Sequence, residues 1–261
     1  MTSTQAAPGD LIREWRRRRN LSQLDLAHRA GVSSRHVSFV ETGRAQPSSA
    51  MILRLCDQLA VPLREQNRVL LAAGYAPAHP EHALADPPMA DVARAVDAIL
   101  AAHVPCPALV VDAGWDLVAA NDAVYALLDG VAPRLLEPPV NVIRLTVDPD
   151  GLAPRIVNLT EWREHLHARL SQEYDAAGDE RVGALLRELG PATDAPHTPA
   201  LVVPLRLRVG TDVLSLLSTT TVFGTPREVT LSELAIEAFY PADEATRALL
   251  AGRSTLSAAR R

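Results

Sequence analysis

The sequence lacks several residue types and patterns, and each absence narrows the interpretation. All 26 basic residues are Arg; the lack of Lys is typical of a GC-rich genome and carries no functional weight. The two cysteines, Cys56 and Cys106, are far apart and have apolar neighbours, so they are expected to be buried thiols and not a metal knuckle. No apolar run reaches the roughly 18 residues of a membrane helix. The first residues lack the basic-then-apolar layout of a signal peptide. We therefore expect a cytoplasmic protein without a membrane segment.

The charge of the chain is unevenly distributed. The formal net charge is −5, yet residues 1–75 hold 11 Arg against 6 Asp or Glu, a balance of +5. Residues 76–261 hold 15 Arg against 25 acidic residues, a balance of −10. A basic N-terminal part on an acidic body fits a protein whose N-terminal part alone approaches the phosphate backbone of DNA.

Residues 20–47 have the pattern of a DNA-binding helix-turn-helix. Ser22-Gln23 opens one helix, Ala30-Gly31-Val32 forms a tight corner, and Ser33 caps a second helix. The core-facing side chains expected on the two helices are Leu24, Leu26, Ala27, Val37 and Val40. Two helices joined by such a turn present the second one to the major groove.

The predicted second helix offers several side chains to DNA. Its N-terminus points N–H groups at the duplex, and Arg35 suits the O6/N7 pair of guanine. Phe39 either contacts a thymine methyl group or packs on a neighbouring helix or a dimer partner. Gln23 either reaches a phosphate or braces the second helix, and Arg44 is expected at a phosphate. The predicted DNA-binding residues are Gln23, Ser33, Ser34, Arg35, Ser38, Phe39 and Arg44.

Glu41 would repel DNA unless it were neutralised, so we expect it to pair with Arg16 inside the helical part. For the basic run Arg16–Arg19 two interpretations stay open, a solvated basic face and, for Arg17 to Arg19, phosphate contacts.

Residues 9–75 closely resemble the phage-repressor-type (Xre) helix-turn-helix family. The matching positions are Leu21-Ser22-Gln23, Leu26-Ala27, Gly31-Val32-Ser33, Val37-Ser38, Glu41-x-Gly43-Arg44 and Pro47. The resemblance implies that Ser34, Arg35 and Phe39 contact bases and that Gln23 and Arg44 contact phosphates. It also implies a salt bridge between Arg16 and Glu41.

The rest of the chain predicts a linker and a second domain. Five short helices are expected up to about residue 75, followed by a Pro- and Ala-rich linker over 76–90. Residues 107–121 have the pattern of two short strands around an Ala-Gly turn, a β-hairpin. Helical or mixed patterns follow to residue 189, and three strands are expected between 200 and 241, the last starting near Arg227. The fold class is therefore an all-α five-helix headpiece plus an α+β domain over 91–250.

The second domain resembles the MmyB-like ligand-binding domain. The matching points are Pro107-Ala108, Trp115-Asp116, Ala120-Asn121-Asp122, Asn141 to Leu145, and Trp162. The resemblance implies a PAS-like sensor domain whose apolar pocket takes a small apolar, fatty-acid-like ligand. Apolar pockets need few charges and one or two polar anchors, which makes Arg144 a candidate anchor for a carboxylate, or else a partner of Asp148 or Glu137. The candidate ligand-binding residues are Trp115, Tyr125, Arg144, Trp162, Leu166 and Phe223.

An enzyme is not expected. Glu161 and His165 stand one helical turn apart, but no further ligand set has a diagnostic spacing for a metal, so Glu161 to His167 are interpreted as a solvated helix face. No cofactor motif is present. We expect a DNA-binding transcription regulator that acts as a homodimer on a double-stranded operator and senses a small apolar ligand. The alternative is an antitoxin-like or other protein-binding regulator without a small-molecule ligand.

Overall fold

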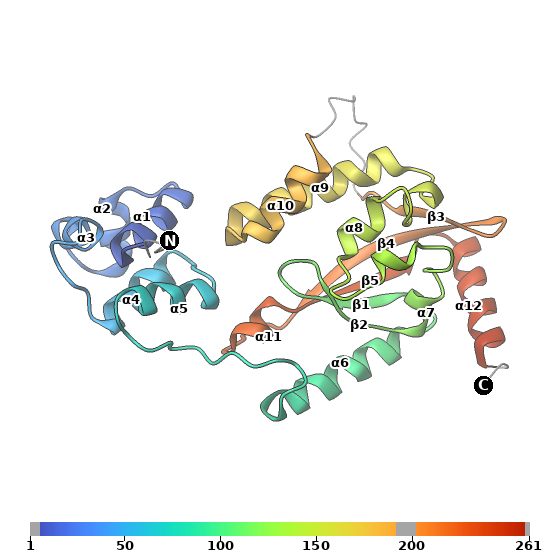
Figure 1. Ribbon diagram of the computed structural model, residues 1–261, viewed down its shortest axis with the longest axis horizontal. Coiled ribbons are helices and arrows are strands. Elements are labelled where there is room, and N and C mark those ends of the chain that lie inside the picture. The colour runs from blue at the N-terminus through green and yellow to red at the C-terminus, as the bar shows by residue number, and fades with distance from the viewer. Residues whose placement is uncertain (1–5, 192–201, 259–261) are drawn as a thin grey trace. The chain divides into compact units, whose positions relative to one another are not determined.

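The computed structural model describes residues 6–191 and 202–258, which form two compact units (Figure 1). The first, here called the helical unit, runs to His82 and also includes the segment Thr225–Ser232. The second, the α+β unit, comprises Ala83–Gly224 and the chain from Glu233.

The helical unit begins with five helices whose ends follow from local chemistry. They are α1 Pro8–Arg18, α2 Gln23–Ala30, α3 Ser34–Glu41, α4 Ser49–Gln58 and α5 Leu63–Ala72. Ser22 and Asp25 form a capping box at the start of α2, and Gly31 ends α2 with a left-handed φ of 62° that a residue without Cβ adopts without strain. Ser33 and Ser48 cap α3 and α4 through their hydroxyl oxygens. The five predicted helices are confirmed.

Buried apolar residues from all five helices form the core of this unit. Leu26, Ala27, Val37 and Val40 belong to it as predicted. The expectation for Leu24 is wrong, because its side chain is 68% exposed. The buried residues of α2 are Leu26, Ala27 and Ala30, so this helix buries a narrower stripe than its apolar content suggests.

The α+β unit is built on one antiparallel sheet with the order β2-β1-β5-β4-β3. Its strands are β1 Ala108–Val111, β2 Leu117–Ala120, β3 Leu205–Val209, β4 Asp212–Val222 and β5 Ala235–Pro241. Its helices are α6 Ala90–His103, α7 Asp122–Tyr125, α8 Val142–Val147, α9 Leu159–Ala177, α10 Glu180–Leu189 and α12 Glu244–Ala258. Short 3₁₀ turns lie at Pro87–Met89, Pro133–Leu135 and Ala153–Arg155.

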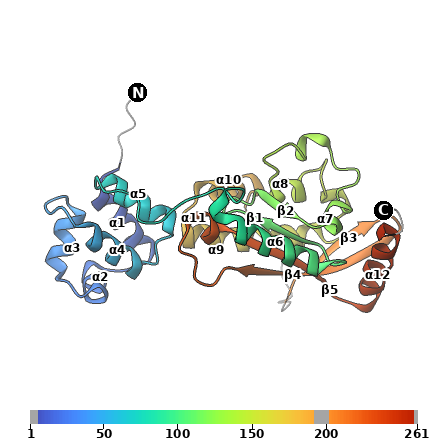
Figure 2. The same ribbon diagram turned by 90° about the horizontal axis from the view of Figure 1, so that it is seen from below.

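Helices cover both faces of this sheet (Figures 1 and 2). α6 packs on one face through Val96 and Leu100, against Val110, Ile236 and Ala238. α8, α9 and α10 cover the opposite face and share its large apolar cluster. Because side chains alternate along a strand, Glu237 and Phe239 of β5 face the second cluster while their neighbours face α6.

Two boundaries differ from the sequence prediction. The last strand begins at Ala235, not near Arg227, because Val229–Glu233 forms the short helix α11, whose first turn is capped by the Glu228 carboxylate accepting from the Leu231 N–H at 2.6 Å. The strand predicted from residue 200 begins at Leu205; residues 200 and 201 lie outside the described chain. The β3–β4 turn at Gly210-Thr211 is as expected, with Gly210 at a φ of 64°.

The segment predicted as a linker, 76–90, is partly held by hydrogen bonds. The Asn67 side chain accepts from the backbone N–H groups of Ala78 and His79 and donates to the His79 carbonyl oxygen. Glu228 accepts from the His82 N–H at 2.7 Å, and the Val229 N–H donates to Pro80 at 2.9 Å. The segment between β4 and β5 therefore packs on residues of this linker.

Candidate DNA-binding surface and ligand cavity

The helix α3 carries exposed side chains on the face opposite its core residues. Ser33 accepts from the His36 N–H at 3.2 Å, which fixes the first turn. Ser34, Arg35 and Arg44 are exposed, whereas Ser38 and Phe39 are half-buried. The Arg35 guanidinium carbon lies 5.1 Å from the Phe39 ring centroid, one helical turn away. This cation–π contact orients Arg35 along the exposed face of α3.

Glu41, at the end of α3, is buried and forms the centre of an ion-pair cluster. Its carboxylate accepts from Arg16 Nε at 2.6 Å and Nη2 at 2.9 Å, and Arg13 Nε lies 3.5 Å away. Gln23 Nε2 donates to the same carboxylate at 2.8 Å. Burial acts to raise the pKa of Glu41, but the Arg16 and Gln23 hydrogen bonds outweigh it and the pKa lies below its ordinary value.

This cluster bears on two expectations. The predicted Arg16–Glu41 pair is present, and Gln23 braces α3 through Glu41, the second of its two predicted roles. In the basic run, Arg19 donates to the carbonyl oxygens of Leu59 at 2.8 Å and Ala60 at 2.9 Å, so it satisfies the end of α4.

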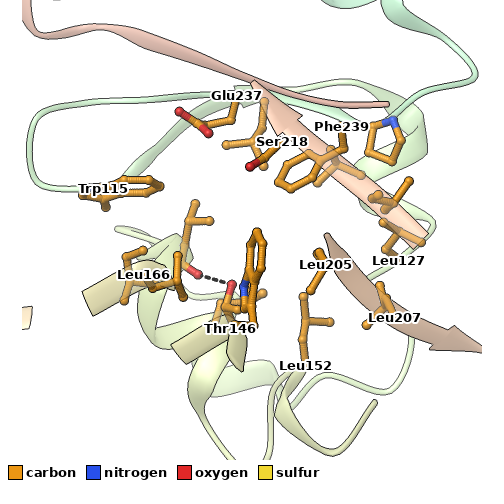
Figure 3. Close-up of a pocket in the computed structure, with 18 of the residues that line it drawn as sticks. Trp115, Leu127, Thr146, Leu152, Leu166, Leu205, Leu207, Ser218, Glu237 and Phe239 are labelled. Atoms are coloured by element: carbon orange, nitrogen blue, oxygen red, sulfur yellow. Dashed lines mark hydrogen bonds between the residues drawn. The ribbon is translucent and has the colours of Figure 1, made fainter. Parts of the chain in front are cut away.

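The α+β unit encloses a cavity between the sheet and the helices α8 and α9 (Figure 3). The space open to the centre of a water molecule is about 90 Å³, several times the roughly 10–15 Å³ that one water needs. Its walls are mainly apolar. They include Leu109, Leu117, Leu127, Leu145, Leu152, Leu166, Leu205, Leu207, Leu216 and Phe239.

One end of the cavity carries charge. In Figure 3 Glu237 and Trp115 lie at one side of the open space, and Leu127 and Leu207 lie at the other. Arg169 donates to both carboxylate oxygens of Glu237, at 2.8 and 2.6 Å, and its Nε donates to Glu173 at 3.1 Å. Burial acts to lower the pKa of Arg169, but the bonds to Glu237 outweigh it and the pKa is raised. Arg169 is therefore a fully ionised, paired cation.

Trp115 completes this charged end. The Arg169 guanidinium carbon lies 4.4 Å from its ring centroid, and its Nε1 donates to Glu173 at 2.8 Å. Trp115 has a φ of 65°, a left-handed conformation that costs energy for a bulky residue. Asp112 holds the turn by accepting from the N–H groups of Gly114 and Asp116 at 2.8 and 2.9 Å.

The helix α9 adds two further polar groups to the cavity wall. The His165 ring stacks on Trp162 with centroids 4.9 Å apart. Burial and the Arg169 charge lower the pKa of His165, so its imidazole is neutral at neutral pH. The buried indole N–H of Trp162 has no acceptor among the residues that the structure describes.

The six predicted ligand-binding residues divide equally. Trp115, Trp162 and Leu166 line the cavity. The other three lie elsewhere: Tyr125 is 53% exposed, and Phe223 packs with the cluster on the α6 face of the sheet. Arg144 forms a half-exposed bidentate pair with Glu188, with both N–O distances at 2.7 Å, so it has neither of the partners considered for it.

Sequence reasoning missed the charged end of the cavity. Trp162, His165, Leu166 and Arg169 follow at helical spacing and share one face of α9, so the interpretation of a solvated face is wrong for His165. Glu237 is the one charged residue in the largely apolar strand β5. This is the sequence signal that could have indicated a buried ionic partner for it. No cluster of three or more metal-ligating side chains occurs in the described parts of the chain. In those parts, no helix has the length and apolar character to cross a membrane.

Comparison with known proteins identifies both units. Residues 92–251 match the family model of the MmyB-like transcription regulator ligand binding domain, and residues 12–66 match that of a helix-turn-helix. A search of curated proteins finds no match. The chain therefore belongs to the MmyB-like transcription regulators, with an Xre-type helix-turn-helix and an α+β ligand-binding domain. It is a DNA-binding transcription regulator, and both matched families are regulatory.

Proposed function

We propose that the protein binds a two-fold operator as a homodimer. Its affinity for this DNA rises or falls when a fatty-acid-like molecule occupies the cavity. The observation that carries this proposal is a mainly apolar cavity in a domain of the same chain as a helix with the exposed side chains Ser34 and Arg35. A cytoplasmic site of action is part of this proposal, in keeping with a DNA-binding regulator. The sheet order β2-β1-β5-β4-β3 supports the PAS-like assignment.

In the proposed DNA complex, α3 lies in the major groove. Ser34, Arg35 and Phe39 contact base edges. Ser38, one helical turn after Ser34, also contacts the DNA. Ser33 points the α3 N-terminus at a phosphate, Arg44 contacts another phosphate, and Gln23 holds α3 in place through Glu41. Two such helices in a dimer would meet half-sites about 34 Å apart.

The test of this proposed DNA complex begins with selection of bound sequences from a random DNA library. On the selected site, Arg35→Ala should weaken binding by about 1–3 kcal/mol and relax preference at one base pair. Arg94→Ala, which removes an exposed Arg of α6, is the matched control and should leave binding unchanged. Unchanged binding by the Arg35 variant would reject the assignment of α3 residues to bases.

The route from cavity to DNA that we propose runs through the chain between β4 and β5. Ser218 on β4 and Glu237 on β5 line the cavity, and the segment between these strands holds the linker through Glu228 and His82. A ligand that favours one arrangement of these strands would also favour one arrangement of the linker. Glu228→Ala should therefore reduce the effect of ligand on DNA affinity while ligand affinity itself is retained, as measured by operator shifts and calorimetry.

A further inference from the structure

The charged end of the cavity indicates which kind of ligand head the cavity accepts. Arg169 and Glu237 line this end, and Glu173, which lies outside the lining, accepts a hydrogen bond from Arg169 Nε. Their formal charges sum to −1, since one cation stands against two anions. Glu237 is almost completely buried, with 3% of its side chain exposed. The ion-pair cluster beside this end of the cavity therefore has one formal negative charge in excess, although the two charges in the cavity wall itself balance.

Arg169, the cation that lines this end of the cavity, is already engaged. Both terminal nitrogens of Arg169 donate to Glu237, its Nε donates to Glu173, and its face stacks on Trp115. Three of its five N–H groups form these bonds, so a ligand carboxylate could bind the other two, as a third carboxylate on one cation, or displace Glu237 or Glu173. The first arrangement leaves two negative charges in excess. The second leaves a protein carboxylate without its partner, which costs several kcal/mol when that carboxylate is buried, as Glu237 is.

The remaining polar groups of the wall are neutral. Thr146 already donates its hydroxyl hydrogen to the Val142 carbonyl oxygen at 2.7 Å. His165 is an uncharged imidazole, Ser218 contributes a hydroxyl, and the Trp162 N–H has no acceptor among the described residues. These last three groups can each donate one hydrogen bond, which suits a carbonyl, amide or hydroxyl oxygen on the ligand. The rest of the wall is apolar and suits an alkyl body.

We propose that the cavity selects an uncharged amphiphile, an alkyl chain with a neutral head that accepts hydrogen bonds, and discriminates against the carboxylate form of a fatty acid. This inference rests on the proposed function, because it names the chemical class of the ligand that the cavity takes.

The test compares three probes of equal chain length on the full-length protein by titration calorimetry at pH 8. Dodecanamide and dodecanoate have the same shape and differ in charge, and dodecane lacks a head. Dodecanamide should bind at least about tenfold more tightly than dodecanoate. Equal or tighter binding of dodecanoate would overturn this inference while leaving the proposed function intact. Failure of all three probes to bind would overturn both.

Two variants change the formal charge of the Arg169 ion-pair cluster with little change in side-chain shape. Glu237→Gln and Glu173→Gln each make the cluster formally neutral, so each should raise dodecanoate affinity about tenfold or more and narrow the preference for the amide. Glu173 is more exposed than Glu237, so its variant remains informative if Glu237→Gln fails to fold. Glu188→Gln removes the same charge from a surface pair outside the cavity and should leave the preference unchanged. An unchanged preference in a folded Glu173 or Glu237 variant would contradict the electrostatic argument.

Discussion

Two bidentate Arg–Glu pairs have nearly the same geometry, each formed through Nε and Nη2, and they should differ sharply in what they contribute to stability. Arg16 binds Glu41 at 2.6 and 2.9 Å, and Arg144 binds Glu188 at 2.7 Å twice. The Glu41 side chain is 0% exposed, whereas that of Glu188 is 48% exposed. Removing one partner of a buried pair costs about 3–5 kcal/mol, and exposed pairs contribute about 0–1 kcal/mol. Burial, not bond length, should decide the outcome.

We therefore expect Glu41→Gln to destabilise the helical unit by about 3 kcal/mol, the low end of that range because the Gln oxygen still accepts one hydrogen bond. Glu188→Gln should cost less than about 1 kcal/mol. Hydrogen exchange of peptides from residues 8–75 isolates the helical unit, and 3 kcal/mol corresponds to exchange about 100-fold faster for globally protected amides. Replacing both partners, Arg16→Met with Glu41→Leu, should recover most of the loss. Equal effects of Glu41→Gln and Glu188→Gln would refute the argument from burial.

Three further predictions concern stability and reactivity. The folded-state pKa of Glu41 lies below its ordinary 4.5, so the stabilisation from Glu41 is present above the unfolded-state pKa and is lost as pH falls through the folded-state value. Glu41→Gln should therefore make the free energy of unfolding of the helical unit depend less on pH below about pH 4.5, as measured by circular dichroism. Gly9→Ala should destabilise by about 1–3 kcal/mol in urea titrations, since its Cβ would clash with the carbonyl oxygens of α3, while Gly224→Ala, with open space around it, should be nearly neutral. Burial raises the pKa of Cys56 to about 12, so iodoacetamide should label it far more slowly than the half-buried Cys106 at pH 8, and equal labelling by mass spectrometry would argue against this packing.

The helical unit was predictable because its signals are local. Ser22, Gly31 and Ser33 each act on backbone groups within three or four residues, so spacing alone places the helix ends. The pairing of Arg16 with Glu41 followed from the need to neutralise a carboxylate near DNA. Leu24 was mispredicted because an apolar residue on a short helix can lie beside the buried stripe as easily as in it.

The cavity was less predictable because it depends on contacts between distant segments. Glu237 on β5 meets Arg169 on α9 only after the antiparallel sheet has folded, and neither position has a local signal that names the other. Likewise α11 replaces the start of a predicted strand because Glu228 caps the helix. The β-prone residues Val229 and Thr230 favour a strand in the sequence prediction.

Three of the Arg–Glu pairs among the described residues are bidentate pairs whose environments give them different roles. Arg16–Glu41 is buried in the helical unit and fixes α3, and Arg144–Glu188 lies on the surface. Arg169–Glu237 borders a cavity, where the pair neutralises a buried carboxylate of β5, and Glu173 is a second carboxylate on the same guanidinium. An isolated Arg in an apolar stretch, such as Arg144, therefore does not indicate a carboxylate site. The deciding quantity is the number of carboxylates that already surround the guanidinium, and at Arg169 that number is two.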